Sequence, residues 1–244
     1  MSNTSSLIQT QNLIKAYGLN VVLRKIDLSV SRGEFVALLG PNGGGKSTLL
    51  RLLAALGKPT AGKITIGGWT LPAEAPAVRA QIGMVGHKPL LYENLNAREN
   101  LRFFARLHNL PPAETDTRIA QLLERVGLAK RTHDLVRTFS RGMQQRLSIA
   151  RALLHNPDVL LFDEPHTGLD QDASLVLDDL LTSAHASGHT VIMTTHDLER
   201  AARLSSRVLI LSRGSLVYDQ PASAQDAAAL AAHYADLTGI ATTR

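Results

Sequence analysis

The amino-acid sequence predicts an α/β protein with a mainly parallel sheet, an antiparallel layer near the N-terminus and an inserted helical subdomain. Short β-branched or Leu-rich segments bounded by turn residues alternate with stretches of helical periodicity, which is typical of parallel sheets covered by helices. The earliest strand-like segments follow one another without a helix, which favours antiparallel pairing. Between residues 97 and 155 the pattern becomes helical throughout, apart from breaks at Pro111, Pro112 and Gly127.

We expect nine strands and place their ends at turn residues. They span residues 7–14, 21–30, 34–39, 63–66, 81–85, 159–163, 190–195, 207–212 and 215–219. A single domain is expected, with a core of residues 1–87 and 158–220, a helical subdomain of residues 88–157 and a C-terminal helical segment of residues 221–244. The helix of this segment is the Ala-rich stretch from Ala222 to Asp236, ended by Gly239, and its pattern assigns it no role.

Composition excludes several classes of function. The chain has 244 residues, 44% of them hydrophobic, and no cysteine, so disulfides, thiolate metal sites and a cysteine nucleophile are absent. Its longest apolar runs are too short to span a bilayer, and its first residues do not form a secretory signal. The net charge is +5, but lysines and arginines are scattered along the chain. We therefore expect neither a dedicated basic surface nor a nucleic-acid partner.

The most informative motif lies directly after the apolar run of residues 34–39. Residues 40–48 (GPNGGGKST) match the phosphate-loop pattern G-x-x-x-x-G-K-[ST]. Glycines let the backbone fold so that successive N–H groups face phosphate oxygens, and the following helix adds its positive N-terminal end. A Gly-rich turn between core elements is the alternative. The expected nucleotide-binding residues are Gly40, Asn42, Gly43, Gly44, Gly45, Lys46, Ser47 and Thr48, with the Ser47 hydroxyl also placed to ligate Mg²⁺.

A second motif ends the apolar run of residues 159–162 in two carboxylates, Asp163 and Glu164. An Asp at a strand end can hold the Mg²⁺ shell, so we expect Asp163 to join Ser47 as a metal ligand. Glu164 is placed to accept a proton from the attacking water or to orient it. An exposed acidic turn is the alternative, and the phosphate loop in the same chain disfavours it. Together the two motifs predict binding and hydrolysis of a nucleoside triphosphate.

Residues 139–146 (FSRGMQQR) precede an amphipathic helix and resemble the Leu-Ser-Gly-Gly-Gln signature of the ATP-binding cassette ATPases. The resemblance implies a P-loop NTPase fold with a RecA-like core. In that family the signature of one subunit covers the γ-phosphate held by the phosphate loop of another, which implies that Ser140 and Gly142 contact ATP across a dimer. Arg141 and Met143 stand where the family has Gly and Gln, and the side-chain contacts at those two positions are not carried over.

The resemblance extends over nearly the whole chain and implies further roles. Tyr17 falls where the family stacks an aromatic ring on adenine, although an ordinary strand tyrosine would look the same. Asp170 matches the loop that links the two sites of the dimer, and His196 matches the switch histidine that bonds the γ-phosphate. His87 stands where the family usually has a Gln that reaches Mg²⁺ or the attacking water. A neutral imidazole could accept similarly, and packing at the hinge to the helical insert is the alternative.

By resemblance, ATP and Mg²⁺ are the cofactors, and a homodimer powers transport through a separate membrane-spanning subunit at the cytoplasmic face of the inner membrane. Residues 85–87, 91–92, 97–106 and 136–145 are similar to the ATPase subunits of haem exporters for cytochrome c maturation. Exporters of drugs, polysaccharides or lipids share much of this pattern. A soluble cassette ATPase without a transport role is the competing class, and a binding module without turnover is disfavoured because Glu164 and His196 are both present.

Overall fold

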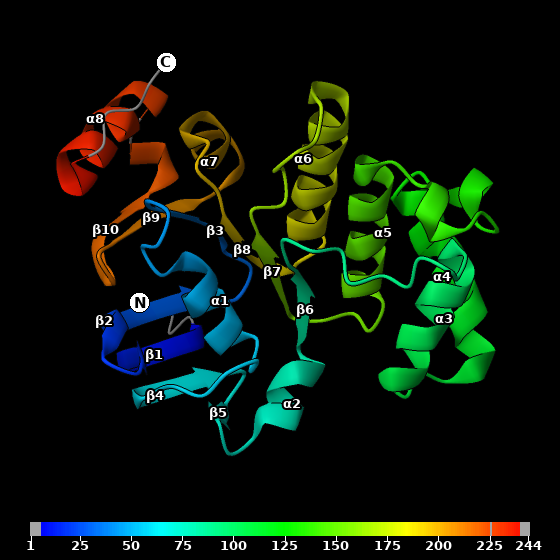
Figure 1. The fold of residues 1–244 in the computed structure, drawn as a ribbon, viewed down its shortest axis with the longest axis horizontal. Coiled ribbons are helices and arrows are strands. Elements are labelled where there is room, and N and C mark those ends of the chain that lie inside the picture. Colours follow the sequence, from blue (N-terminus) through cyan, green and yellow to red (C-terminus); the bar gives the residue numbers. More distant parts are fainter. Residues whose placement is uncertain (1–5, 225, 240–244) are drawn as a thin grey trace.

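The computed structural model describes residues 6–224 and 226–239, which form two sheets with helices around them (Figure 1). The larger sheet is six-stranded, in the order β10-β9-β3-β8-β7-β6, and all its neighbouring strands run parallel except β10, which pairs antiparallel with β9. Its strands are β3 (Phe35–Leu39), β6 (Ile82–Val85), β7 (Val159–Asp163), β8 (Thr190–Thr194), β9 (Arg207–Ser212) and β10 (Ser215–Pro221).

The smaller sheet is four-stranded and antiparallel, in the order β2-β1-β4-β5. Its strands are β1 (Ser6–Tyr17), β2 (Asn20–Ser31), β4 (Ala61–Ile66) and β5 (Trp69–Leu71). The predicted fold class, with a parallel core and an early antiparallel layer, is therefore confirmed. The expected strands match observed ones within a few residues, and β5 is additional because three residues are too short to show alternation.

Eight α-helices connect these strands within the described residues. They are α1 (Lys46–Leu53), α2 (Ala75–Ala80), α3 (Ala97–Leu107), α4 (Pro112–Arg125), α5 (Arg141–Leu153), α6 (Gln171–Ala186), α7 (Leu198–Leu204) and α8 (Ala227–Thr238), with short 3₁₀ turns at Ala129–Arg131, Val136–Thr138 and Ala222–Ala224. Helices α3, α4 and α5 form the helical insert, which lies beyond the β6 edge of the larger sheet (Figure 1). None of the helices in this described part combines the length and the hydropathy needed to cross a bilayer.

The central strands β3, β7 and β8 of the larger sheet are buried along their whole length, which explains why they lack the polar alternation of a half-exposed strand. On β7, Val159 and Leu161 pack with α1 and the smaller sheet, whereas Leu160 and Phe162 pack with α5 and α6. This division follows from the two-residue repeat of a strand. The parallel strands consequently end together, so that the segments after β3, β7 and β8 meet at one edge.

The C-terminal helix differs from its prediction. Ala222–Ala224 is a 3₁₀ turn, and α8 begins at Ala227 because the Asp226 carboxylate accepts the Ala229 N–H at 2.7 Å and caps the helix there. The predicted end is confirmed, since Gly239 has a φ of 71° and follows the last helical residue. Residues 1–5 of the expected core, and residues 225 and 240–244 of the expected C-terminal segment, lie outside the described residues.

Candidate active site

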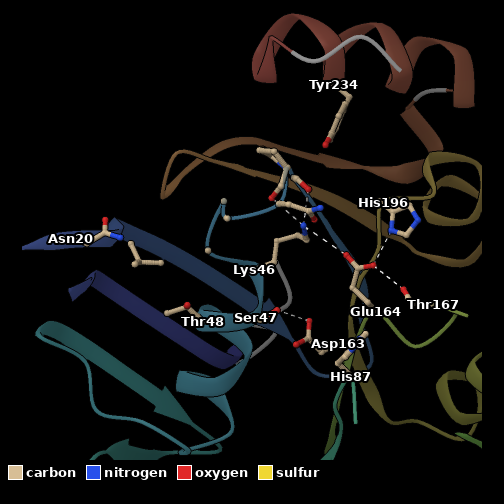
Figure 2. A pocket seen from close by; sticks show the side chains of 17 residues that line it. Asn20, Lys46, Ser47, Thr48, His87, Asp163, Glu164, Thr167, His196 and Tyr234 are labelled. Carbon is tan, nitrogen blue, oxygen red and sulfur yellow. Dashed lines mark hydrogen bonds and ion pairs between the residues drawn. The ribbon is translucent and has the colours of Figure 1, made fainter. Parts of the chain in front are cut away.

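A pocket of about 920 Å³ opens where the segments after β3, β7 and β8 meet (Figure 2). It brings together most of the residues predicted from the motifs. The lining consists of Asn20, Val22, all nine residues from Gly40 to Thr48, His87, Asp163, Glu164, Thr167, His196 and Tyr234. The phosphate loop, both carboxylates and both candidate histidines therefore share one cavity, although they come from four separate parts of the sequence.

The phosphate loop needs glycine for two physical reasons. Gly40, Gly43 and Gly45 have φ values of 148°, 77° and 107°, in the region that side chains disfavour. A Cβ atom at Gly45 would also lie 2.7 Å from Leu23 Cδ2, and one at Gly40 would collide with the Leu211 carbonyl. The loop can therefore turn tightly between β3 and α1, which leaves the N-terminus of α1 directed at the pocket.

Lys46 is the cation of this loop, and its side chain is 7% exposed. Its Nζ donates to the carbonyl oxygens of Gly40 at 2.7 Å and Pro41 at 3.2 Å, and it lies 3.8 Å from Glu164 Oε1. Burial lowers the pKa of Lys46, and the Glu164 and Asp163 carboxylates oppose that shift. A charge held this far from water attracts a phosphate group strongly.

Asp163 and Ser47 provide the oxygens that Mg²⁺ prefers. Ser47 Oγ donates to Asp163 Oδ1 at 2.9 Å, and Thr194 Oγ1 on β8 donates to the same oxygen at 2.9 Å. Asp163 is 8% exposed. Because Mg²⁺ binds through one or two protein oxygens together with phosphates and waters, this pair beside the phosphate loop fits the ion.

Glu164 lies at the centre of the polar groups in the pocket. Its Oε2 is 2.8 Å from His196 Nδ1 and accepts from Thr167 Oγ1 at 3.2 Å, while its Oε1 faces Lys46. Its φ of 53° is unusual for a side chain other than glycine, and its N–H donates to Thr194 Oγ1 at 2.9 Å. Such backbone strain, held by surrounding hydrogen bonds, is common at functional sites. Groups of the chain itself therefore orient the carboxylate.

Of two further predicted residues, His87 lines the pocket and Tyr17 does not. His87, exposed just after β6, lines it, which is where a contact to the metal or the water would require it. Tyr17 at the end of β1 is 55% exposed. The Lys15 ammonium lies over its ring, with Nζ 4.6 Å from the ring centroid. The cross-strand neighbour of Tyr17, Asn20, lines the pocket instead. The proposed roles of His87 and Tyr17 stay predictions.

Ser140, Gly142 and Asp170 gather outside the pocket, at the adjacent N-termini of α5 and α6. Ser140 Oγ accepts the Met143 N–H at 3.2 Å, and Asp170 Oδ1 accepts the Ala173 N–H at 2.8 Å. A Cβ atom at Gly142 would lie 3.0 Å from the Ala173 Cβ, so glycine lets the two helix ends approach closely. We call these three residues the signature surface.

Arg141 departs from the family pattern and contacts the linking loop. A Cβ atom at Gly168 would lie 2.6 Å from Arg141 Cζ, so the guanidinium lies across that glycine. Gly168 has a φ of 76°. The arginine therefore packs within its own chain, beside the signature surface.

Besides Pro41 within the phosphate loop, sequence reasoning missed four residues that line the pocket: Asn20, Val22, Thr167 and Tyr234. Thr167 follows the Asp-Glu motif closely, so its position in the sequence was an available signal. For Tyr234 the sequence offered no such signal, apart from its being the tyrosine of an Ala-rich helix.

The fold and this pocket define the chain as a P-loop nucleotide hydrolase. The family model for ABC transporters matches residues 23–167, and the chain belongs to that family. The chain is 36% identical over 211 residues to the linearmycin resistance ATP-binding protein LnrL of Bacillus subtilis (strain 168), covering 86% of this chain and 68% of LnrL. It is 40% identical over 210 residues to a Nod factor export ATP-binding protein I of Cupriavidus pinatubonensis, with 86% and 65% covered.

A third relative, the daunorubicin resistance ATP-binding protein DrrA3 of Streptomyces coeruleorubidus, is 41% identical over 203 residues, covering 83% of this chain and 64% of its own. The chain thus spans about two thirds of the length of these curated relatives. Among solved structures, a dimeric post-hydrolysis state of the ATP-binding cassette MJ0796 with ADP and Pi superimposes with a TM-score of 0.80 at 29% identity, covering 88% of this chain and 98% of that one.

A cbiO1 structure from Clostridium perfringens, part of the cbiONQ transporter complex, has a TM-score of 0.82 at 27% identity, with 90% of each chain covered. The chain is therefore an ATP-binding and ATP-hydrolysing cassette of the ABC transporter family. LnrL, DrrA3 and the Nod factor protein are named for antibiotic resistance and Nod factor export, and they do not support the finer assignment to haem export and cytochrome c maturation.

Proposed function

We propose that this chain is the ATPase subunit of an exporter and that two copies close head to tail around ATP. The observation that carries the proposal is the separation of two complementary half-sites on one chain. The pocket holds the loop and the groups for hydrolysis, whereas the signature surface presents two helix N-termini suited to an anion. A head-to-tail pair brings the surface of one copy over the pocket of the other, and the dimeric structure of MJ0796 with ADP and Pi supports the pairing of two copies.

Within each pocket, the loop N–H groups and Lys46 hold the triphosphate, and Ser47 with Asp163 would hold Mg²⁺. The ion neutralises charge on the phosphate oxygens when it is bound. Glu164 orients a water molecule towards the γ-phosphorus and accepts its proton as the bond to the leaving oxygen of ADP breaks. His196, held through Nδ1 by Glu164 Oε2, keeps its other ring nitrogen for the γ-phosphate, and the loss of that phosphate on hydrolysis loosens the pair.

A separate membrane subunit is the partner that we propose for the helical insert, with the chain bound peripherally at the cytoplasmic face of the inner membrane. The relatives named for linearmycin and daunorubicin resistance and for Nod factor export favour a small organic cargo. Haem export rests on the sequence resemblance of residues 85–87, 91–92, 97–106 and 136–145 alone.

The test is affinity purification of the Glu164→Gln variant with ATP from detergent-solubilised native membranes, followed by mass spectrometry. The variant is chosen because a pair that hydrolyses slowly stays closed. Recovery of a polytopic membrane protein is the expected result, and the same purification with Lys46→Ala serves as the control that does not close. Cytochrome c maturation proteins beside the partner would establish the haem assignment. Recovery from the soluble fraction with no membrane partner would refute transport and leave the ATPase activity.

A further inference from the structure

Helix α8 contributes a side chain to the ATP pocket that belongs to none of the nucleotide motifs. The helix packs against α7 and lies over the larger sheet near β9, with Leu230 buried beneath it. Tyr234 belongs to the same buried cluster as Leu230, and it also lines the pocket together with the phosphate loop. Figure 2 shows its ring pointing from α8 towards the loop, with the hydroxyl end foremost.

The Tyr234 side chain is buried, yet its hydroxyl is unpaired. The residue is 8% exposed. Within residues 6–224 and 226–239 the hydroxyl makes no hydrogen bond, although the Tyr234 backbone carbonyl accepts from Thr238 Oγ1 at 2.6 Å. The hydroxyl oxygen is not among the buried atoms that lack a partner, because it opens into the pocket. A donor directed into an open pocket is available to whatever the pocket binds.

The Tyr234 hydroxyl points towards the end of the pocket where Lys46, Glu164 and His196 lie (Figure 2). Burial raises the pKa of Tyr234, and the Glu164 carboxylate raises it further, so the phenol keeps its proton at neutral pH and acts as a donor. Asn20 lines the other side of the pocket, away from Tyr234 (Figure 2).

We propose that the Tyr234 hydroxyl donates a hydrogen bond to the terminal phosphate of ATP bound in the same copy. Helix α8 thereby supplies a contact that ADP lacks, and it makes the pocket selective for the triphosphate. This inference rests on the ATP-binding mode described under Proposed function, because the γ-phosphate must lie beside Lys46 and Glu164.

The test compares the affinities of Tyr234→Phe and the unchanged protein for ATPγS and for ADP, by calorimetric titration with Mg²⁺. The substitution removes one oxygen and keeps the ring. A hydrogen bond to a charged group predicts that ATPγS binds about tenfold more weakly while ADP affinity changes less than about twofold. Tyr92→Phe, at an exposed tyrosine outside the pocket, is the matched control and leaves both affinities unchanged. Unchanged ATPγS affinity in a folded Tyr234→Phe protein, or equal losses for both nucleotides, would overturn the proposal.

A second measurement needs no variant. Tetranitromethane nitration of Tyr234, mapped by mass spectrometry, is expected to slow several-fold with ATPγS relative to ADP, whereas nitration of Tyr92 is the same with both. Equal nitration of Tyr234 in the two complexes would also overturn the contact. Lys46→Ala separates the two levels of inference: if it binds ATPγS normally, the binding mode itself fails, and if it loses binding while Tyr234→Phe does not, only the role of Tyr234 fails.

Discussion

The ATP pocket and the signature surface differ in how their side chains are engaged. In the pocket, Lys46, Glu164 and His196 are linked to one another by distances of 3.8 Å and 2.8 Å. On the signature surface, Ser140 and Asp170 each bond the N-terminus of their own helix and no other residue described. The groups proposed for hydrolysis are therefore arranged within one copy, whereas in the proposed head-to-tail pair the signature surface meets an anion brought by the other copy. Substitutions in the pocket should therefore have consequences different from those of substitutions on the signature surface.

The largest effect is expected from Glu164→Gln. The amide keeps the shape of the carboxylate but cannot accept the proton, so ATP hydrolysis should fall by about 10²-fold or more. ATP binding should persist, and dimers should accumulate with ATP. Phosphate release and size-exclusion chromatography measure both. Glu93→Gln, at an exposed carboxylate outside the pocket, should behave as the unchanged protein. A Glu164→Gln protein that turns over normally would contradict the role of general base.

Lys46→Ala should weaken ATP binding itself. It removes a buried cation facing the phosphates, and a charged hydrogen bond of this kind corresponds to an affinity loss of about tenfold or more. Equilibrium titration with a fluorescent ATP analogue measures the loss. Lys63→Ala on the exposed part of β4 makes the same change in net charge and should leave the affinity intact. Equal affinities of the two variants would remove the phosphate-loop assignment.

Ser140→Ala should separate the halves. A single copy should bind ATP with unchanged affinity, while ATP-dependent dimerisation and hydrolysis fall several-fold. Because Ser140 also caps α5, the variant should lose about 1 kcal/mol of folding stability. Asn96→Ala removes the cap of α3 at a similar cost in stability and should not affect dimerisation. If both cap variants dimerise equally, Ser140 has no part in covering ATP.

The smallest expected effect concerns pH and the loop that joins the two halves. Burial and the nearby Arg200 charge lower the pKa of His166 to about 4, against the opposing pull of Asp178. His166 therefore takes up a proton near pH 6.5 in the unfolded chain, but only near pH 4 in the folded chain. Stability present above pH 6.5 should thus be lost as the pH falls towards 4.

This loss should amount to about 1 kcal/mol between pH 7 and 5.5. Denaturant unfolding at the two pH values measures it, and His166→Gln should flatten the dependence. His133→Gln, at an exposed histidine, should retain it. A His166→Gln protein with the same pH dependence as the unchanged chain would show that other groups carry the effect.

The sequence was sufficient to predict the pocket residues at strand ends. Asp163, Glu164 and His196 follow apolar segments, and parallel strands must end at one edge of their sheet, so their meeting with residues 40–48 follows from the fold class. The presence of Tyr234 in the pocket could not be predicted, because it depends on how α8 packs against the rest of the fold. No local sequence pattern indicates that tertiary contact. The start of α8 was missed for a related reason, since one capping carboxylate at Asp226 outweighed the helix propensity of the alanines before it.

The buried carboxylate of Asp178 has a consequence for how substitutions in this protein are interpreted. It is 2% exposed and binds His166 at 2.7 Å, Arg200 at 3.0 Å and Arg203 at 2.5 Å. His166 follows Glu164 in the chain, and the two arginines lie on α7, just after His196. One carboxylate on α6 therefore holds together the segment that follows Glu164 and the segment that follows His196. Asp178 contacts none of the described residues of the pocket directly, yet its substitution would displace Glu164 and His196 and so lower the rate of ATP hydrolysis. A genetic screen for catalytic residues would therefore recover Asp178 although its role is structural.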